Sequence, residues 1–204
     1  RGRLAGGAVW GWASLMWVVT ISGSLCSAPL LPRWLGLLAQ LGSGRVTVVC
    51  GGGGFVEVVK QARALWHFDD LPARNMAVLA MAQMAYLAQG LEPRLRLAAN
   101  EASLRKVLRA GHTALWLPTE LLRDGPSRDT TWELSSDNIA LDLACRLNAE
   151  HLVLVKSGVS DPIASLAQLG KRGLLEQRFE SIASGAGLPM HVVGCADLTR
   201  MRAL

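Results

Sequence analysis

Aromatic residues are scarce in this chain: they make up 5% of its 204 residues, with one Tyr and three Phe. The 21 Lys and Arg residues outnumber the 16 Asp and Glu residues, but they are scattered and do not alternate with the few aromatic residues. Proteins that bind single-stranded nucleic acid combine a basic groove with stacking aromatic side chains. The composition therefore predicts no nucleic-acid partner and fits nucleotide phosphates better.

Paired cysteines are also missing. The sequence has no CxxC pair, and no histidine lies at a spacing that would complete a zinc site. The cysteines lie mostly within apolar runs, so we expect buried, reduced thiols rather than disulfides or metal ligands. Reduced cysteines are typical of a cytoplasmic protein. The four are Cys26, Cys50, Cys145 and Cys195.

Several catalytic and nucleotide-binding motifs are absent. The sequence contains no GxxxxGK[ST] and no GxSxG, and Val56 occupies the last position of the GxGxxG pattern that begins at Gly51. The histidines are isolated from one another in the sequence, which disfavours a catalytic histidine. The Asp69-Asp70 pair could bind a metal, but a solvated loop pair is the favoured interpretation.

Residues 4–25 contain no charged side chain and follow Arg1 and Arg3. Signal peptides and membrane spans show the same pattern of an uncharged stretch after basic residues. This stretch contains glycines, tryptophans and hydroxyl side chains, and it ends in a strand-to-turn signature. We therefore expect residues 1–14 to form a disordered or strand-like extension before a single domain over residues 15–204. We expect no membrane partner.

Apolar runs alternate with helical patterns along the chain. Because these runs have no polar side, they predict strands of a mainly parallel sheet covered on both faces, and an α/β fold class. The predicted strands are Leu15–Ile21, Val46–Cys50, Leu95–Ala99, Thr113–Leu117, Leu152–Lys156 and Met190–Val193.

The helical patterns are clearest in four places: Pro32–Leu41, Phe55–Leu65, Glu101–Arg109 and Asp137–Leu147. Asn100 and Ser136 are the predicted N-caps of the last two. The segment Asn75–Ala88 differs from a surface helix because it is apolar on nearly every face. Two interpretations stay open for it: a central core helix, or a helix shared between the core and a subunit interface.

The run Trp17–Leu25 places an apolar strand before a turn rich in Gly and Ser. Backbone N–H groups at Gly23 and Ser24 can approach an anion closely, as in anion-binding nests. The Thr20 hydroxyl can donate a hydrogen bond to a phosphate oxygen. Unlike a lysine, it cannot offset the negative charge that develops during phosphoryl transfer. We expect Thr20, Gly23 and Ser24 to form a phosphate-binding element without its cation.

Three further features fall where open parallel sheets bind ligands. The glycine run Gly51–Gly54 follows a strand, and four glycines favour contact with an anion or substrate over a bare turn. Lys156 ends a strand, so we expect its ammonium to contact phosphate rather than only solvent. Asp137 either complements a helix dipole or orients a lysine or a magnesium ion.

Taken in order, these elements resemble the amino acid kinase family, which includes aspartate, acetylglutamate and uridylate kinases. The matching segments are Val18–Leu25, Val46–Gly54, Ser135–Ala140 and Leu152–Ser157. The run Trp66–Gln83 looks most like a small branch similar to the aminomethylfuran-phosphate kinases of methanofuran-type cofactor biosynthesis.

The resemblance implies a three-layer αβα sandwich, assembled as dimers or higher oligomers, that uses ATP and Mg²⁺ to phosphorylate a small phosphate or carboxylate acceptor. By analogy, Gly23 and Ser24 face the transferring phosphate, and Asp137 and Lys156 are catalytic. The residues implied in acceptor binding are Gly52, Gly53 and Gly54, and those implied in nucleotide binding are Lys156 and Ser157.

The chain departs from the family at the catalytic lysine: the usual Lys-x-Gly-Gly-Ser reads Thr20-Ile21-Ser22-Gly23-Ser24 here. Three functions stay open. The chain is an active kinase that relies on Lys156, magnesium and backbone amides, or a degenerate structural or regulatory subunit that pairs with a complete paralogue. The third is an anion-binding or storage protein.

Overall fold

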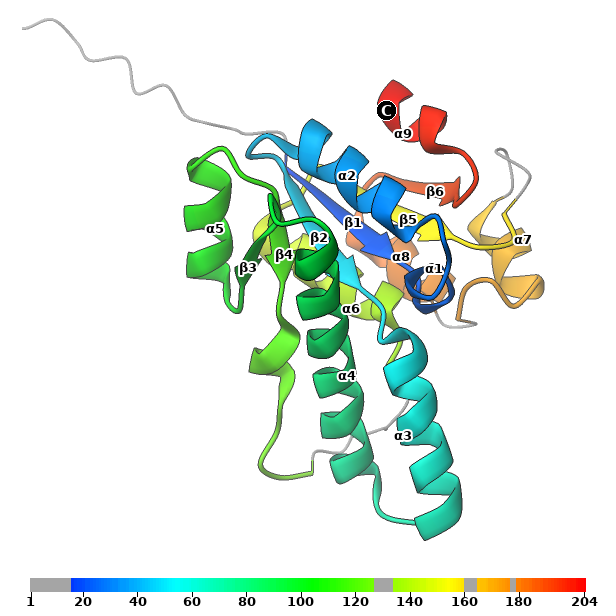
Figure 1. Ribbon diagram of the computed structural model, residues 1–204. Coiled ribbons are helices and arrows are strands. Elements are labelled where there is room, and N and C mark those ends of the chain that lie inside the picture. Colours follow the sequence, from blue (N-terminus) through cyan, green and yellow to red (C-terminus); the bar gives the residue numbers. More distant parts are fainter. Residues whose placement is uncertain (1–15, 127–133, 160–164, 177–178) are drawn as a thin grey trace, which may run out of the picture.

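The computed structural model describes residues 16–126, 134–159, 165–176 and 179–204 (Figure 1). Their strands form one sheet in the order β3-β4-β2-β1-β5-β6, in which every neighbouring pair is parallel. All six predicted strands are confirmed, whereas Leu15 and the expected extension over residues 1–14 lie outside the described residues. The strands are β1 (Trp17–Ile21), β2 (Val46–Cys50), β3 (Arg96–Ala98), β4 (Ala114–Trp116), β5 (His151–Lys156) and β6 (Met190–Gly194).

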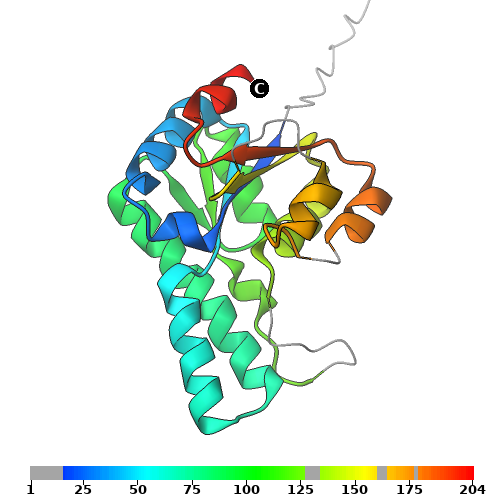
Figure 2. The ribbon, with the colours of Figure 1, turned by 90° about the vertical axis from the view of Figure 1, so that its right-hand side faces the viewer.

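Helices cover both faces of this sheet (Figures 1 and 2), which confirms the three-layer α/β architecture. One face packs against α2, α9 and the second half of α4. The other packs against α5, α6, α7 and α8. The helices are α1 (Gly23–Cys26), α2 (Leu31–Gly42), α3 (Gly53–Trp66), α4 (Asp70–Leu91), α5 (Glu101–Arg109), the 3₁₀ helix η1 (Pro118–Leu121), α6 (Ser136–Leu147), α7 (Leu166–Lys171), α8 (Phe179–Ala186) and α9 (Leu198–Ala203).

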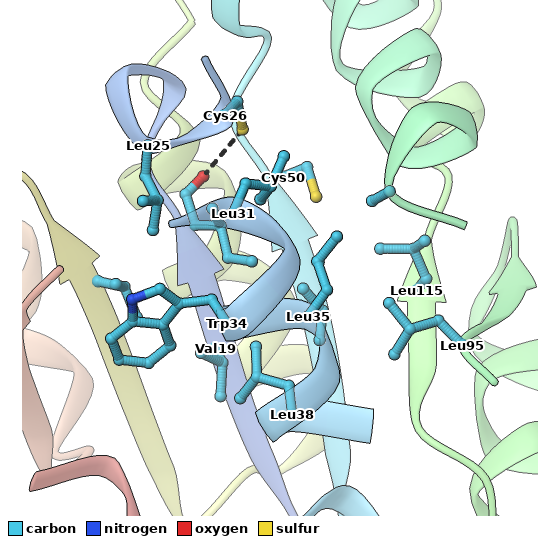
Figure 3. Close-up of a cluster of buried hydrophobic side chains, with 14 of the residues drawn as sticks. Val19, Leu25, Cys26, Leu31, Trp34, Leu35, Leu38, Cys50, Leu95 and Leu115 are labelled. Carbon is cyan, nitrogen blue, oxygen red and sulfur yellow. Dashed lines mark hydrogen bonds between the residues drawn. The ribbon is translucent and has the colours of Figure 1, made fainter. Parts of the chain in front are cut away.

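The central strands are mostly apolar because both of their sides are buried. In β1, Val19 packs toward α2 whereas Val18 packs toward α6, as the alternation of side chains along a strand requires. Trp34 of α2 is fully buried over the sheet (Figure 3). Its indole N–H donates to the carbonyl of Cys195 at 2.7 Å. These strands therefore have no polar side because a layer of helices covers each face of the sheet, as predicted.

The apolar segment Asn75–Ala88 lies within α4, a helix of 22 residues. Helices α3 and α4 contact each other and extend side by side beyond the sheet (Figures 1 and 2). One side of α4 is buried, but Leu79, Tyr86 and Leu87 on the other side are exposed. The interpretation of Asn75–Ala88 as a central core helix, buried on all sides, is therefore wrong. The alternative, a helix shared between the core and a subunit interface, stays a prediction.

The N-cap predictions have different outcomes. Asn100 caps α5 as predicted, in a capping box with Ser103. In α6 the prediction of Ser136 is wrong, because Ser135 caps the helix and its hydroxyl accepts from the Asn138 N–H at 3.4 Å. The helix begins one residue earlier than predicted, which leaves the Ser136 side chain in the first turn.

The expectation of buried cysteines holds for Cys26 and Cys50 but is wrong for Cys145, which is exposed on α6. All four cysteines are free thiols. Cys26 ends α1 and Cys50 ends β2, and the Cys26 thiol donates to the carbonyl of the next residue, Gly51, at 3.5 Å, a contact that the sequence separation did not reveal. Over the described ranges, no helix has both the length and the apolarity needed to cross a membrane.

Candidate functional site

The candidate site lies at the carboxyl ends of β1, β2 and β5, which are neighbours in the sheet. Ladder hydrogen bonds continue into the turns that follow these strands. The Gly51 N–H donates to the Ile21 carbonyl at 2.8 Å, and the Ser22 N–H donates to the Val155 carbonyl at 3.2 Å. Parallel sheets bind ligands at this edge because the turns of several strands meet there.

The glycines allow the turns after β1 and β2 to touch. A Cβ at Gly51 would lie 2.6 Å from the Gly23 nitrogen, and one at Gly23 would lie 3.2 Å from the Gly53 nitrogen. Gly53 also has φ +53, which favours glycine. Close packing thus explains these glycines, but nothing lies within 4 Å of a Cβ built at Gly54.

A cavity of about 390 Å³ opens beside these turns. It brings together the predicted phosphate-binding residues Gly23 and Ser24 and the predicted acceptor-binding glycines, including Gly54. Sequence reasoning missed the part of the lining contributed by α3 and α4, whose surfaces cannot be told from core by pattern alone. The lining comprises Gly23, Ser24, Ser27, Gly51, Gly52, Gly53, Gly54, Val56, Glu57, Lys60, Ala77, Met81, Leu134 and Ser136.

A chain of hydroxyl groups connects the β1 turn to the β5 turn. The Ser22 and Ser24 hydroxyls lie 3.2 Å apart, and Ser24 donates to the Ser157 hydroxyl at 3.0 Å. The structure therefore places Ser24, predicted to bind phosphate, in contact with Ser157, predicted to bind nucleotide. Such hydroxyls can reorient to donate to a phosphate oxygen.

Asp137 and Lys156 form a buried ion pair in which the Lys156 ammonium donates to Asp137 Oδ2. Their side chains are only 5% and 12% exposed, respectively. Asp137 Oδ1 is also buried, and it has no hydrogen-bond partner among the described residues. The Asp137 carboxylate therefore orients Lys156 and keeps one oxygen that could accept a further ligand.

Thr20 lies on the same side of the sheet as Lys156, because it pairs with Leu154, two residues before the lysine. Its side chain is fully buried, and its hydroxyl has no hydrogen-bond partner in the described part of the chain. Thr20 is also not among the residues that line the cavity. Its role in phosphate binding stays a prediction.

No group of three or more His, Cys, Asp and Glu residues could hold a metal ion within the described ranges. Asp70 of the predicted Asp69-Asp70 pair accepts from Arg63 at 2.5 Å. Mg²⁺ is commonly held by one or two carboxylates together with substrate phosphates. Asp137 Oδ1 fits that mode.

The histidines are less isolated than their sequence positions suggest. His191 Nε2 and His151 Nδ1 lie 3.1 Å apart, because β5 and β6 are neighbours in the sheet. Burial, followed by the positive charges of His151 and Arg200, lowers the pKa of His191. Since this pair lies at the amino ends of the strands, it is remote from the cavity.

Neither a protein-family model nor a curated protein sequence matches the chain. Solved structures do. The uridylate kinase from Archaeoglobus fulgidus superposes over 87% of this chain and 90% of its own, with a TM-score of 0.63 and 18% identity. The UMP kinase from Bacillus anthracis covers 92% and 90%, with a TM-score of 0.64 and 18% identity.

The chain shares the fold of the uridylate kinases. A third structure, the N-acetylglutamate synthase from Neisseria gonorrhoeae, has a TM-score of 0.55 and 20% identity, over 89% of this chain and 56% of its own. The fold expected from the family resemblance is therefore confirmed. The resemblance to the methanofuran-type branch stays a prediction.

Proposed function

We propose that the chain is an ATP-dependent kinase that phosphorylates a small phosphate or carboxylate acceptor in the cavity. The observation that carries this proposal is the buried Asp137–Lys156 ion pair, which lies at the same edge of the sheet as the glycine turns because Lys156 ends β5. Neither side chain lines the cavity itself, but Ser136, beside Asp137, does. A buried charge pair is costly unless its geometry serves a purpose, and fixed positive charge is what phosphoryl transfer requires.

Each residue has a distinct role in this proposal. Backbone N–H groups at Gly23 and Ser24 hold the transferring phosphate, while the glycines from Gly52 onward admit the acceptor. Lys156 neutralises charge that develops on the phosphate, and Asp137 orients the lysine. Asp137 Oδ1 would hold Mg²⁺, which supplies further charge neutralisation when bound with ATP.

The proposal is tested by ADP release with a panel of phosphate and carboxylate acceptors. Lys156→Met is expected to lower kcat by about two to three orders of magnitude, because it removes a preorganised charge. Lys106→Met, on an exposed position of α5, is the matched control and should leave kcat unchanged. No turnover with any acceptor, together with no ATP binding in calorimetry, would contradict the proposal.

A second function is supported by Thr20, whose buried hydroxyl occupies the position of the family lysine. In this alternative the chain is a catalytically degenerate subunit with a structural or regulatory role in a complex with a complete paralogue. Purification from the native source separates the two functions. Isolation of the chain only with itself would exclude the hetero-complex.

We further propose that the chain forms a homodimer or higher oligomer through α4. Met76, Leu79, Tyr86 and Leu87 are exposed on this helix, and Tyr86 is 59% exposed. Apolar side chains gathered on one exposed helix face are typical of an interface between proteins. A second copy of the chain would cover this face.

A further inference from the structure

Two histidines and a tryptophan meet at the amino ends of the strands, at the opposite edge of the sheet from the cavity. Trp17 begins β1 and is the strand neighbour of His151, which begins β5. His191, the second residue of β6, is the neighbour of Val153, two residues after His151. Because side chains alternate along a strand, all three rings lie on the same face of the sheet.

The three rings are packed together. The ring centroids of His151 and His191 lie 5.1 Å apart, and those of Trp17 and His151 lie 4.7 Å apart. The Trp17 and His191 rings are nearly parallel, with an interplanar angle of 19° and a centroid distance of 6.4 Å. The indole therefore lies beside both imidazoles and limits the rotamers open to them.

The separation of the two imidazoles suits a metal ion. His191 Nε2 and His151 Nδ1 lie 3.1 Å apart. Imidazole nitrogens bind Zn²⁺ at about 2.0–2.1 Å, so two of them on one ion are about 2.9–3.4 Å apart at ligand angles of about 90–109°. The two histidines can therefore share an ion with little movement of either ring.

The protonation of the pair is compatible with metal binding. Without a metal ion, one ring donates its N–H to the facing nitrogen of the other. When an ion binds, the donor ring changes tautomer: its proton moves to its other nitrogen, and both facing lone pairs point at the ion. Burial, followed by neighbouring positive charge, lowers the pKa of His191. A lower pKa keeps this imidazole neutral near pH 7, which is the state that binds a metal.

The ligand set determines which ions fit. Imidazole suits Zn²⁺, Cu²⁺ and Ni²⁺, whereas Mg²⁺ prefers oxygen ligands. Since no group of three or more His, Cys, Asp and Glu residues could hold a metal in the described ranges, an ion at this pair has two protein ligands. Both histidines are half-buried, so water can complete the coordination.

We propose that His151 and His191 bind a divalent transition-metal ion, Zn²⁺ or Cu²⁺, at the amino ends of β5 and β6. The two histidines are 40 positions apart in the sequence, and the unfolded chain does not hold them together. A bound ion therefore stabilises the fold by joining the two strands. This site is independent of the proposed kinase function, because it lies at the opposite edge of the sheet from the cavity.

Calorimetric titration of the full chain with Zn²⁺ alone tests the inference. We expect His191→Gln and His151→Gln each to raise the Kd for Zn²⁺ by at least about tenfold, because each removes a ligand. His112→Gln, at an exposed position before β4, is the matched control and should keep the wild-type Kd. Mg²⁺ should not compete for the site. Absence of Zn²⁺ binding, or an unchanged Kd in His191→Gln, would overturn the inference.

Thermal unfolding separates metal binding from a purely structural hydrogen bond between the histidines. Either role predicts that His191→Gln lowers Tm in the absence of metal. Only a metal site predicts that Zn²⁺ raises the Tm of the wild-type protein as its concentration increases, and that this rise is lost in His191→Gln. A Tm that does not respond to Zn²⁺ would leave the hydrogen bond as the role of the pair and would overturn the inference.

Trp17 reports the position of the ion. Bound Cu²⁺ quenches the fluorescence of a nearby indole, and the Trp17 ring lies against both histidines. We expect Cu²⁺ to quench the wild-type protein more strongly than Trp17→Phe, whereas the Kd for Zn²⁺ stays the same in both. Equal quenching of the two proteins would place the bound Cu²⁺ elsewhere and would contradict the site.

Discussion

In the proposed function, Thr20 takes the position of the lysine in the amino acid kinase family that the sequence resembles, and its side chain faces the layer that contains α6. Asp137, whose partner Lys156 lies two residues after the strand neighbour of Thr20, keeps one oxygen without a partner among the described residues. We predict that Thr20→Lys raises the rate of ADP release by about tenfold or more, because the new ammonium can pair with Asp137 and supply positive charge.

Thr47→Lys is the matched control for this substitution. Thr47 is also fully buried, and its hydroxyl has no hydrogen-bond partner in the described ranges. It pairs with Val18 near the start of β1, however, at the end of the strands away from Lys156 and Asp137. A lysine there should destabilise the protein without raising turnover. Equal behaviour of the two variants would show that Thr20 has no special relation to the site.

The Cys50 thiol predicts a dependence of stability on pH. The hydrogen bond with Cys26, followed by burial, raises the pKa of Cys50 well above its usual range. A raised pKa stabilises the fold below the unfolded-state pKa of about 8.5, and this stabilisation is lost as pH rises toward the folded-state pKa. We expect Tm to fall above about pH 8.5, and the fall to be smaller in Cys50→Ala. Cys145→Ala, at an exposed position, should keep the wild-type pH dependence.

At the scale of elements, the start of α6 joins helix stability to the candidate site. Ser135 caps the helix, whereas Ser136 lines the cavity and Asp137 binds Lys156. We predict that Ser135→Ala lowers the free energy of unfolding by about 1 kcal/mol, whereas Ser136→Ala changes it little. Urea unfolding of the two variants measures the difference. A larger loss in Ser136→Ala would indicate that the two serines have exchanged roles.

The same helix start shows how far the sequence can predict an element. The Ser135-Ser136-Asp137 run identifies a helix start, because all three side chains favour its first positions. The pattern does not distinguish two adjacent serines, since either hydroxyl could reach an N–H group two or three residues later. That one-residue choice depends on the backbone direction at Ser135, which tertiary contacts determine and local sequence preference does not.

At the scale of the whole molecule, the sequence predicts where the strands are but not which strands lie next to each other in the sheet. Short continuous apolar runs indicate strands of a buried parallel sheet, and each of the six predicted runs contains a strand. The order β3-β4-β2-β1-β5-β6 depends on crossover connections, which leave no local signal. The contacts of Cys26 with Gly51, of His151 with His191, and of Asp137 with Lys156 all depend on which strands are neighbours.

The exposed apolar face of α4 predicts the assembly state. Because burial of such side chains favours association, we expect the wild-type chain to sediment as a dimer or higher oligomer at micromolar concentration. The double substitution Leu79→Glu and Tyr86→Glu should shift it to a monomer with unchanged circular dichroism, since charges at an apolar interface lose their hydration. Ile182→Glu, at an exposed apolar position on α8, should leave the assembly intact. A monomeric wild-type chain would contradict the interface and leave α4 exposed for another partner.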